Sequence, residues 1–312
     1  YTRYDVLKRT GRTSADIHQP PRAGGFRECH VARPGMTFGF CDYDSVELVT
    51  WSQICLWWFG FSKMAELINS GIDPHIYFAA HLLGDTYEIA SAAYAAKDPK
   101  YYGPMGARQL AKIGNYGLLG GMGPATFVSN VAGYGIHITK EPDDTHPLPS
   151  AREIYQGFRV SFPEAPLYFG RMSNATIGGT SFTAVQATSL RQRGGVGYMD
   201  GCNTYFQGLA SDGWKAGAWA LRKASVDRSS PLYGVKAWLA LHDESGTEGP
   251  VDTCHIWAPE QARLMREAMQ KYCPDVKVGC STVVSACWSK SAKTVYNDKG
   301  IVIPWNIKLQ QP

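Results

Sequence analysis

The sequence predicts an α+β fold in which a sheet carries two aspartates and a largely helical block is inserted between the strands that bear them. The segment MTFGF alternates apolar residues on one face, and the next residue on that face is Asp42. The segment VKAWLAL alternates in the same way and leads to Asp243. Between these two segments, Gly and Pro repeatedly interrupt stretches of helical character.

The elements follow one another in four regions: 1–60 with the first strand, 61–190 with the helical block, 191–293 with the second set of strands, and 294–312 as a C-terminal tail. Residues 1–35 are polar and rich in Pro and Gly, which favours loops. The further elements are expected as a helix over 44–58, broken helices over 61–123, a loop over 139–150, a helix over 151–162, a glycine-rich loop or turn over 191–201, a helix from near Gln207, a strand–turn–strand around Asp243, an amphipathic helix over 259–273 and a final strand over 276–288.

Composition places the chain among soluble globular proteins. Its 312 residues are 44% hydrophobic and 19% charged, and 31 Lys and Arg against 27 Asp and Glu give a net charge of +4, which alone says little about nucleic acid. No apolar run approaches the roughly 18 residues of a membrane span. Eight cysteines without a C-x-x-C pair favour free thiols over a zinc site. We expect a cytoplasmic protein and, since the chain opens at Tyr1 without a Met, part of a longer polypeptide.

The two strand-end aspartates predict a metal site if their strands lie side by side. Converging carboxylates repel each other, and a cation between them offsets the repulsion. Oxygen ligands of this kind suit Mg²⁺, and two such ions about 3.5–4 Å apart form the usual clamp for displacement at phosphorus. Taken alone, Asp42 and Asp243 fit ordinary turn positions equally well.

A helix over about 106–121 carries residues suited to a nucleoside triphosphate. Arg108, Lys112 and Tyr116 lie at i, i+4 and i+8 and therefore on one face. Two cations one turn apart fit phosphates, and the ring fits a sugar or base. A solvated basic face with a core tyrosine is the alternative. Close approach by a ligand, or bending, would explain why this helix contains several glycines, each of which costs about 1 kcal/mol against Ala, namely Gly114, Gly117, Gly120 and Gly121.

Six stretches in this order resemble the family A DNA polymerases of the bacterial DNA polymerase I type: TGRTS, DYDSVEL, DPHIYFAAHLLG, RQLAKIGNYG, NTYFQG and LHDE. Three of them match the family motifs D-Y-S-x-x-E-L, R-x-x-x-K-x-x-x-(F/Y)-G and H-D-E, and the likeness runs from Thr10 to Lys293. The resemblance implies a polymerase palm, with an antiparallel sheet carrying the catalytic aspartates, and an inserted helical fingers subdomain. It also implies a template-directed DNA polymerase whose partners are a DNA primer–template and dNTPs.

The resemblance assigns roles to matching residues. Asp42 and Asp243 would bind two Mg²⁺ ions with the Tyr43 carbonyl, and Glu244 would be an auxiliary catalytic group. Glu47 would exclude a sugar 2′-hydroxyl, and Arg108, Lys112 and Tyr116 would bind the nucleotide. The residues assigned to the primer–template are Arg12, Arg22, Gln207, His242 and Asn203. Hydrogen-bond donors in the minor groove test base-pair geometry without reading the sequence.

The chain departs from the family pattern at several places. Asp44 stands where Ser is usual, and Gly120 stands where bacterial members have a Tyr near the template base. A thumb and a proofreading exonuclease domain are not expected within this chain, so duplex grip and editing would come from the parent polypeptide or a partner. These departures suggest a phage-like, divergent member, in which case the host cytoplasm is its location. A single-subunit RNA polymerase-like enzyme, a non-catalytic nucleic-acid-binding relic and a fragment that folds only with its thumb remain the alternatives.

Overall fold

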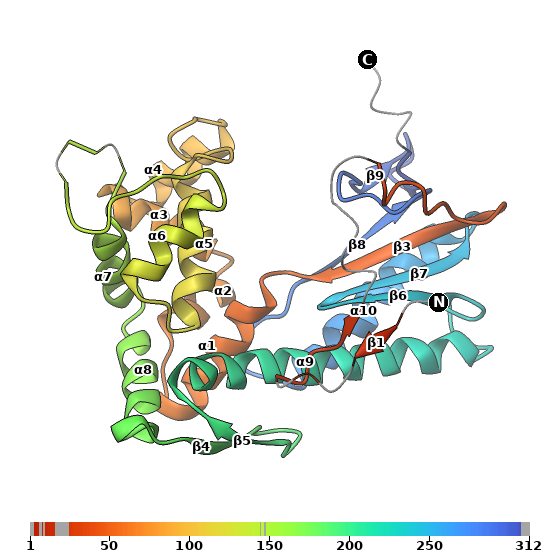
Figure 1. Ribbon diagram of the computed structural model, residues 1–312. Coiled ribbons are helices and arrows are strands. Elements are labelled where there is room, and N and C mark those ends of the chain that lie inside the picture. Colours follow the sequence, from red (N-terminus) through yellow and green to blue (C-terminus); the bar gives the residue numbers. More distant parts are fainter. Residues whose placement is uncertain are drawn as a thin grey trace. The chain divides into compact units, whose positions relative to one another are not determined.

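The computed structural model describes residues 3–5, 8, 10–15, 25–143, 145–146 and 148–306. The chain divides into two compact units, each with its own core. The first unit comprises Tyr1–Val46, Gln207–Pro274 and Val278–Pro312, and the second comprises Glu47–Phe206 and Asp275–Lys277. Figure 1 shows the elements of each unit coloured along the chain.

The first unit is built on a four-stranded sheet with the strand order β6-β7-β3-β8 (Figure 1). All three neighbouring pairs are antiparallel. The two strands predicted to end in aspartates are therefore in one sheet, separated only by β7. Their bounds are β3 Met36–Tyr43, β6 Lys236–Leu241, β7 Glu244–Pro250 and β8 Cys280–Ser285.

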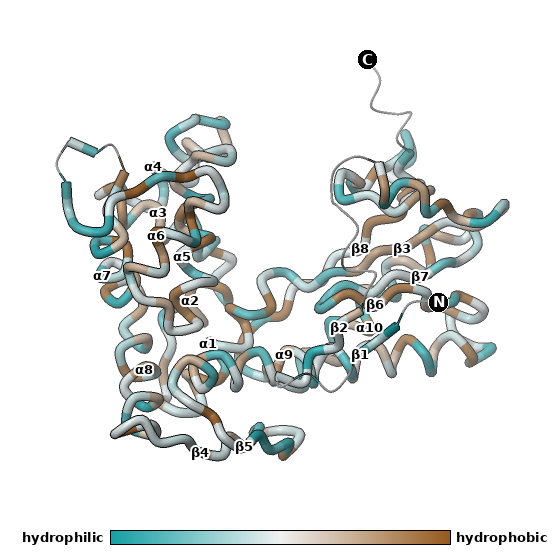
Figure 2. The backbone as a smooth tube through the Cα atoms, in the orientation of Figure 1, coloured by the Kyte–Doolittle hydropathy of each residue, from teal (hydrophilic) through white to brown (hydrophobic). Residues whose placement is uncertain are grey.

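One face of this sheet buries the apolar residues whose alternation predicted the strands. The residues of this cluster are Phe38, Phe40, Leu239, Leu241 and Trp288. Figure 2 shows the hydrophobic stretches along these strands. The predicted alternation of β6 is interrupted by a β-bulge, because Ala237 pairs with Thr247 and Leu239 pairs with Gly246, which leaves Trp238 as an extra residue. Trp238 packs on Phe38 with ring centroids 4.6 Å apart.

Helix α10 packs against the sheet in the first unit. It spans Cys254–Gln270 and so begins five residues before the predicted start, with Pro259 inside it rather than at its first position. Tyr43 anchors β3 to this helix, because its buried hydroxyl donates to the Met265 carbonyl at 2.8 Å. The other strands described in this unit form two small antiparallel pairs: β1 Tyr4–Asp5 with β2 Ser14–Ala15, and β9 Val295–Tyr296 with β10 Val302–Ile303.

The second unit is mainly helical, as the sequence predicted for 61–190. Four of its helices begin at a Ser, Thr or Asp whose side chain accepts a hydrogen bond from a terminal backbone N–H group, as in the Ser150–Glu153 capping box. The bounds are α1 Val46–Phe59, α2 Lys63–Asn69, α3 Pro74–Leu83, α4 Tyr87–Ala95, α5 Ala107–Leu119, α6 Pro124–Ala132, α7 Ala151–Ser161, α8 Glu164–Ala175 and η2 Ile177–Gly179.

Helix α5 lies in the core of this unit and packs against α3, α6 and α7. Aromatic side chains fill the space around α3 and α7, where the rings of Phe78, Phe158 and Phe162 contact one another. The described helices include none with the length and apolar character that a membrane crossing requires.

The glycine-rich segment 191–201 is not the loop that the sequence predicted. Gln192–Val196 forms strand β5, which pairs with β4 Phe182–Val185, and helix α9 begins at Tyr198 and runs to Val226. Pairing with β4 supplies the backbone hydrogen bonds that a glycine-rich sequence does not favour by itself. Helix α9 therefore starts nine residues before Gln207 and contributes residues to both units.

Candidate active site

A two-residue turn joins β6 to β7 and carries the LHDE motif. Leu241 pairs with Glu244, so His242 and Asp243 form the turn itself. His242 has φ 51°, a left-handed conformation that such turns usually give to Gly. A non-glycine residue held there costs about 1–3 kcal/mol, and strain of this kind clusters at functional sites.

The β3 register brings Asp42 level with this turn. Cys41 pairs with Ser245, so the next residue, Asp42, comes beside Glu244. The dense packing around Asp42 and the carboxylates of Asp243 and Glu244 raise the pKa of Asp42 to about 7, although its side chain reaches solvent. The structure thus brings three carboxyl groups together at one end of the sheet.

Lys290 is a further member of this cluster that the sequence analysis missed. Its Nζ contacts Oε2 of Glu244 at 2.5 Å, and the Glu244 side chain is only 9% exposed. Lys290 also lowers the pKa of Asp42, against the larger effects that raise it. Lys290 follows the last strand of the sheet, and its only sequence signal is a basic residue close after that strand.

Two carboxylates of this cluster are available as oxygen donors to a divalent cation. Among the described residues, no group of three or more His, Cys, Asp and Glu side chains is arranged to hold a metal ion. Glu244 is occupied by Lys290, which leaves Asp42 and Asp243 as the acidic donors. Mg²⁺ is usually bound by one or two carboxylates together with water and substrate phosphates, rather than by a cage of protein ligands. The donor set therefore fits Mg²⁺.

The two residues that follow Asp42 have different surroundings. The Tyr43 side chain is buried against Met265, and burial raises the pKa of its hydroxyl. Its main-chain carbonyl is therefore the group to consider as a ligand. Asp44 packs against Gly279, whose carbonyl accepts from the Asp44 N–H at 3.0 Å, and burial raises the pKa of the Asp44 carboxyl.

The TGR loop is tied to helix α9, which also carries Gln207. The Gly11 carbonyl accepts from Ser211 Oγ at 2.5 Å and from Lys215 Nζ at 2.7 Å. These bonds hold Arg12 beside the helix that bears Gln207, so two residues assigned to the primer–template belong to one connected substructure. Arg22 lies outside the described residues.

In the second unit, Arg108, Lys112 and Tyr116 all lie on α5, as predicted. Lys112 is exposed, whereas Arg108 and Tyr116 are half-buried. Asp73 at the start of α3 binds Arg108, with Nε and Nη2 at 2.9 and 2.7 Å from Oδ2.

His75 is a second residue that the sequence analysis missed, although it lies within the quoted DPHIYF stretch. Its ring centroid is 5.6 Å from that of Tyr116. Burial, with Arg108 and Lys112 nearby, lowers the pKa of His75 to about 4 against the opposing effect of Asp73. Nδ1 lies 2.9 Å from the Asn115 amide, and Nε2 is buried without a hydrogen-bond partner among the described residues.

Glu47 and Asn203 are placed near helix ends. Glu47 lies half-buried in the first turn of α1. The Asn203 amide donates to the Gly120 carbonyl at 3.1 Å and to the Met199 carbonyl at 2.9 Å. Asn203 therefore connects α9 to the C-terminal end of α5.

Close packing accounts for three of the glycines in and just after α5. A Cβ at Gly114 would lie 3.2 Å from the Phe78 ring, and one at Gly120 would lie 2.8 Å from Oδ1 of Asn203. Gly121 has φ 81°, and a Cβ there would lie 2.8 Å from Cys202 Sγ. A tyrosine at position 120 would require Asn203 to move.

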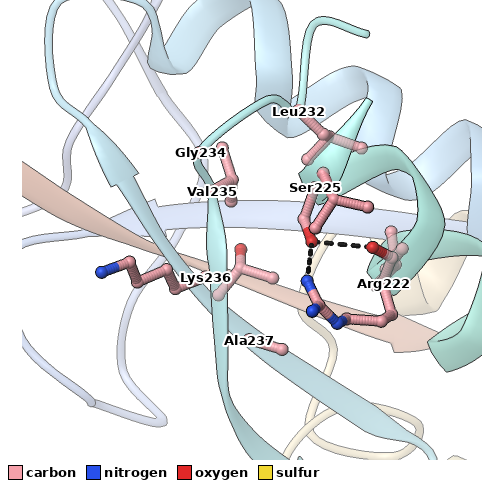
Figure 3. Close-up of a pocket in the computed structure, with 10 residues that line it drawn as sticks. Arg222, Ser225, Leu232, Gly234, Val235, Lys236 and Ala237 are labelled. Atoms are coloured by element: carbon pink, nitrogen blue, oxygen red, sulfur yellow. Dashed lines mark hydrogen bonds between the residues drawn. The ribbon is translucent and has the colours of Figure 1, made fainter. Parts of the chain in front are cut away.

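A cavity of about 460 Å³ lies in the first unit but contains none of the predicted site residues (Figure 3). It lies between the C-terminal part of α9 and β6, where Ser225 Oγ donates to the Arg222 carbonyl at 2.8 Å. Its lining residues are Leu221, Arg222, Ser225, Val226, Leu232, Gly234, Val235, Lys236, Ala237 and Thr247.

The fold is similar to that of a solved DNA polymerase domain. It matches the POL domain of Pol1 from M. smegmatis, determined in complex with DNA primer-template and dNTP, with a TM-score of 0.69 and 19% sequence identity. The match covers 92% of this chain and 47% of the other, so the chain spans about half the length of that protein. No protein-family model matches the sequence, and no curated protein matches it.

Proposed function

We propose that this chain is the catalytic part of a family A-type, template-directed DNA polymerase. The observation that carries the proposal is the convergence of Asp42 on Asp243 and Glu244 at one end of the sheet, in a chain whose fold resembles a polymerase domain. In this proposal the first unit is the palm and the second is the fingers.

The acidic cluster serves nucleotidyl transfer. In this proposal Asp42, Asp243 and the Tyr43 carbonyl would hold two Mg²⁺ ions, which would supply Lewis-acid chemistry that favours ionisation of the attacking hydroxyl and offsets negative charge on the leaving pyrophosphate. The primer 3′-oxygen forms a bond to the α-phosphorus of the dNTP, the bond to the bridging oxygen breaks, and the hydroxyl proton passes to solvent. Glu244, paired with Lys290, keeps the cluster from accumulating a third uncompensated charge.

Helix α5 binds the nucleotide. Arg108 and Lys112 contact the triphosphate, and Tyr116 lies against the sugar. Glu47 selects deoxynucleotides by crowding the sugar 2′ position.

The residues near the hairpin and α9 bind the primer–template. His242, exposed at the β6–β7 turn, and Arg12 with Gln207 present donors to the minor groove, where acceptors are nearly the same for every base pair. Asn203 and Arg22 complete this proposed set. Such contacts favour a correctly paired primer end without reading its sequence.

Primer extension with Mg²⁺ tests the proposal. The wild-type chain should extend a primer according to its template, and Asp42→Asn or Asp243→Asn should abolish extension while leaving primer–template affinity largely unchanged. Asp298→Asn, an exposed aspartate of the same unit, is the matched control and should keep activity. Either active-site variant with near-normal turnover would overturn the site assignment.

The same assay separates the alternatives. Preferential incorporation of rNTPs would favour an RNA polymerase-like enzyme and would contradict the role given to Glu47. Tight primer binding without any extension by the wild-type chain would favour a non-catalytic relic. Extension with dNTPs but not with rNTPs would support the proposal that the chain is a DNA polymerase.

A further inference from the structure

Asp73 is a fixed anion at the start of α3. Its Oδ1 accepts from the backbone N–H groups of His75 at 2.7 Å and of Ile76 at 3.3 Å, which makes it the N-cap of that helix. These bonds orient the carboxylate and leave Oδ2 directed to α5. Asp73 thus connects the N-termini of two helices.

The guanidinium group of Arg108 is held by Asp73 at one edge and by the Tyr94 ring on one face. Its Nε and Nη2 donate to Oδ2 of Asp73, and its guanidinium lies 4.9 Å from the ring centroid of Tyr94. The two side chains of the ion pair are only 24% and 28% exposed, so water screens the pair incompletely. The arginine therefore has one defined orientation before any ligand arrives.

The held guanidinium still has donors to offer. Arginine has five N–H groups, and Asp73 occupies one at Nε and one at Nη2. The two at Nη1 and the second at Nη2 form another edge, suited to bidentate contact with a phosphate. Among the described residues Nη1 donates no hydrogen bond, and the Arg108 side chain is 24% exposed.

We propose that Asp73 is a positioning residue for the incoming nucleotide, because it fixes Arg108 so that the other edge of its guanidinium receives the triphosphate. The inference rests on the proposed function and adds a residue to it. Arginine has a long, flexible side chain that loses rotamer freedom when it binds a ligand. Because the contacts with Asp73 and Tyr94 already restrict the Arg108 rotamers in the free protein, less side-chain entropy is lost when the nucleotide binds. This preorganisation strengthens nucleotide binding.

Asp73→Asn tests the positioning role with little change of shape. Asn caps helices as well as Asp does, so α3 should keep its start, whereas the charged contact to Arg108 is lost. We expect KM for dNTP, and the dissociation constant of one dNTP with Mg²⁺ on a dideoxy-terminated primer–template, to rise on the order of tenfold. The value of kcat should change by less than about threefold, and primer–template affinity should be unchanged.

Asp85→Asn is the matched control. Asp85 forms an ion pair with Lys100 at 2.6 Å in the same unit and does not contact Arg108. This variant should leave nucleotide KM unchanged. A general response of the unit to a lost carboxylate would affect both variants alike and would overturn the inference, as would an unchanged or lower nucleotide KM in Asp73→Asn.

A double-mutant cycle with Arg108→Ala separates this inference from the proposed function. If Asp73 acts through Arg108, adding Asp73→Asn to Arg108→Ala should change KM by less than about twofold. An Arg108→Ala variant with normal nucleotide affinity would remove the triphosphate role of Arg108 and the inference with it. A large effect of Arg108→Ala with none of Asp73→Asn would overturn the inference alone.

Tyr94→Leu gives an independent check should Asp73→Asn fold poorly. It removes the ring beneath the guanidinium but leaves the α3 cap intact. Nucleotide KM should rise about threefold with unchanged primer–template affinity. An unchanged KM would show that Arg108 does not depend on being held.

Discussion

Replacing Lys290 with Met removes the cation that faces the acidic cluster and should destabilise the protein. The Nζ of Lys290 lies 2.5 Å from Oε2 of Glu244, whose side chain is 9% exposed, whereas that of Lys290 is 38% exposed. Removing one partner of a fully buried pair costs 3–5 kcal/mol, and the exposure of Lys290 reduces this to about 2 kcal/mol. We expect Tm to fall by roughly 4 °C.

The same variant should change the pH dependence of metal binding. Burial, Asp243 and Glu244 raise the pKa of Asp42 to about 7, and Lys290 lowers it. A proton on Asp42 competes with Mg²⁺, so in the wild type the Mg²⁺ concentration for half-maximal extension should rise as pH falls through about 7. In Lys290→Met this rise should begin at higher pH.

The sign of the stability effect gives a readout independent of activity. The Asp42 pKa is higher in the folded protein than the ordinary value of 3.8, so its contribution to stability is fully present below about pH 4 and is lost as pH rises through about 7. Mg²⁺ should therefore raise Tm more at pH 8 than at pH 6. Thermal unfolding at a series of pH values, with and without Mg²⁺, measures both the pH dependence of Tm and the rise in Tm that Mg²⁺ causes.

Lys293→Met is the matched control, since Lys293 is an exposed lysine three residues further along the chain. It should retain the wild-type Tm and pH profile. If Lys290→Met behaved like Lys293→Met in both measurements, the pairing of Lys290 with Glu244 and its effect on Asp42 would be refuted.

Three further outcomes are expected. His242→Gly should relieve the strain of φ 51° and raise stability by about 0.5–1 kcal/mol in urea unfolding while weakening primer–template binding; lower stability would contradict a strained turn. Gly120→Ala should lower stability by about 1 kcal/mol, because its Cβ displaces Asn203, and an unchanged Tm would show that the contact yields freely. Tyr116→Phe should increase discrimination against dideoxynucleotides on the order of tenfold to a hundredfold, since the phenol replaces the missing 3′-hydroxyl; equal chain termination by both proteins would remove Tyr116 from the sugar.

Local pattern was sufficient for β3, β6 and α5, although it failed for the glycine-rich segment 191–201. Alternation identified β3 and β6 and placed Asp42 and Asp243 at their ends, because a strand's side chains follow a period of two whatever its partner is. The helical spacing of Arg108, Lys112 and Tyr116 was likewise correct, since it depends only on the geometry of α5.

The side-chain contacts between residues far apart in the sequence were decided only by the tertiary structure. The sequence by itself determined that Asp73 can cap a helix and that Arg108 lies on another, but only the packing of α3 on α5 brings Oδ2 to the guanidinium. Lys290 similarly meets Glu244, 46 residues away, only because the sheet brings them together. Periodicity reports which side of an element is buried and carries no information about what covers it. The partner that sets a side chain's orientation and pKa is therefore decided when the elements pack.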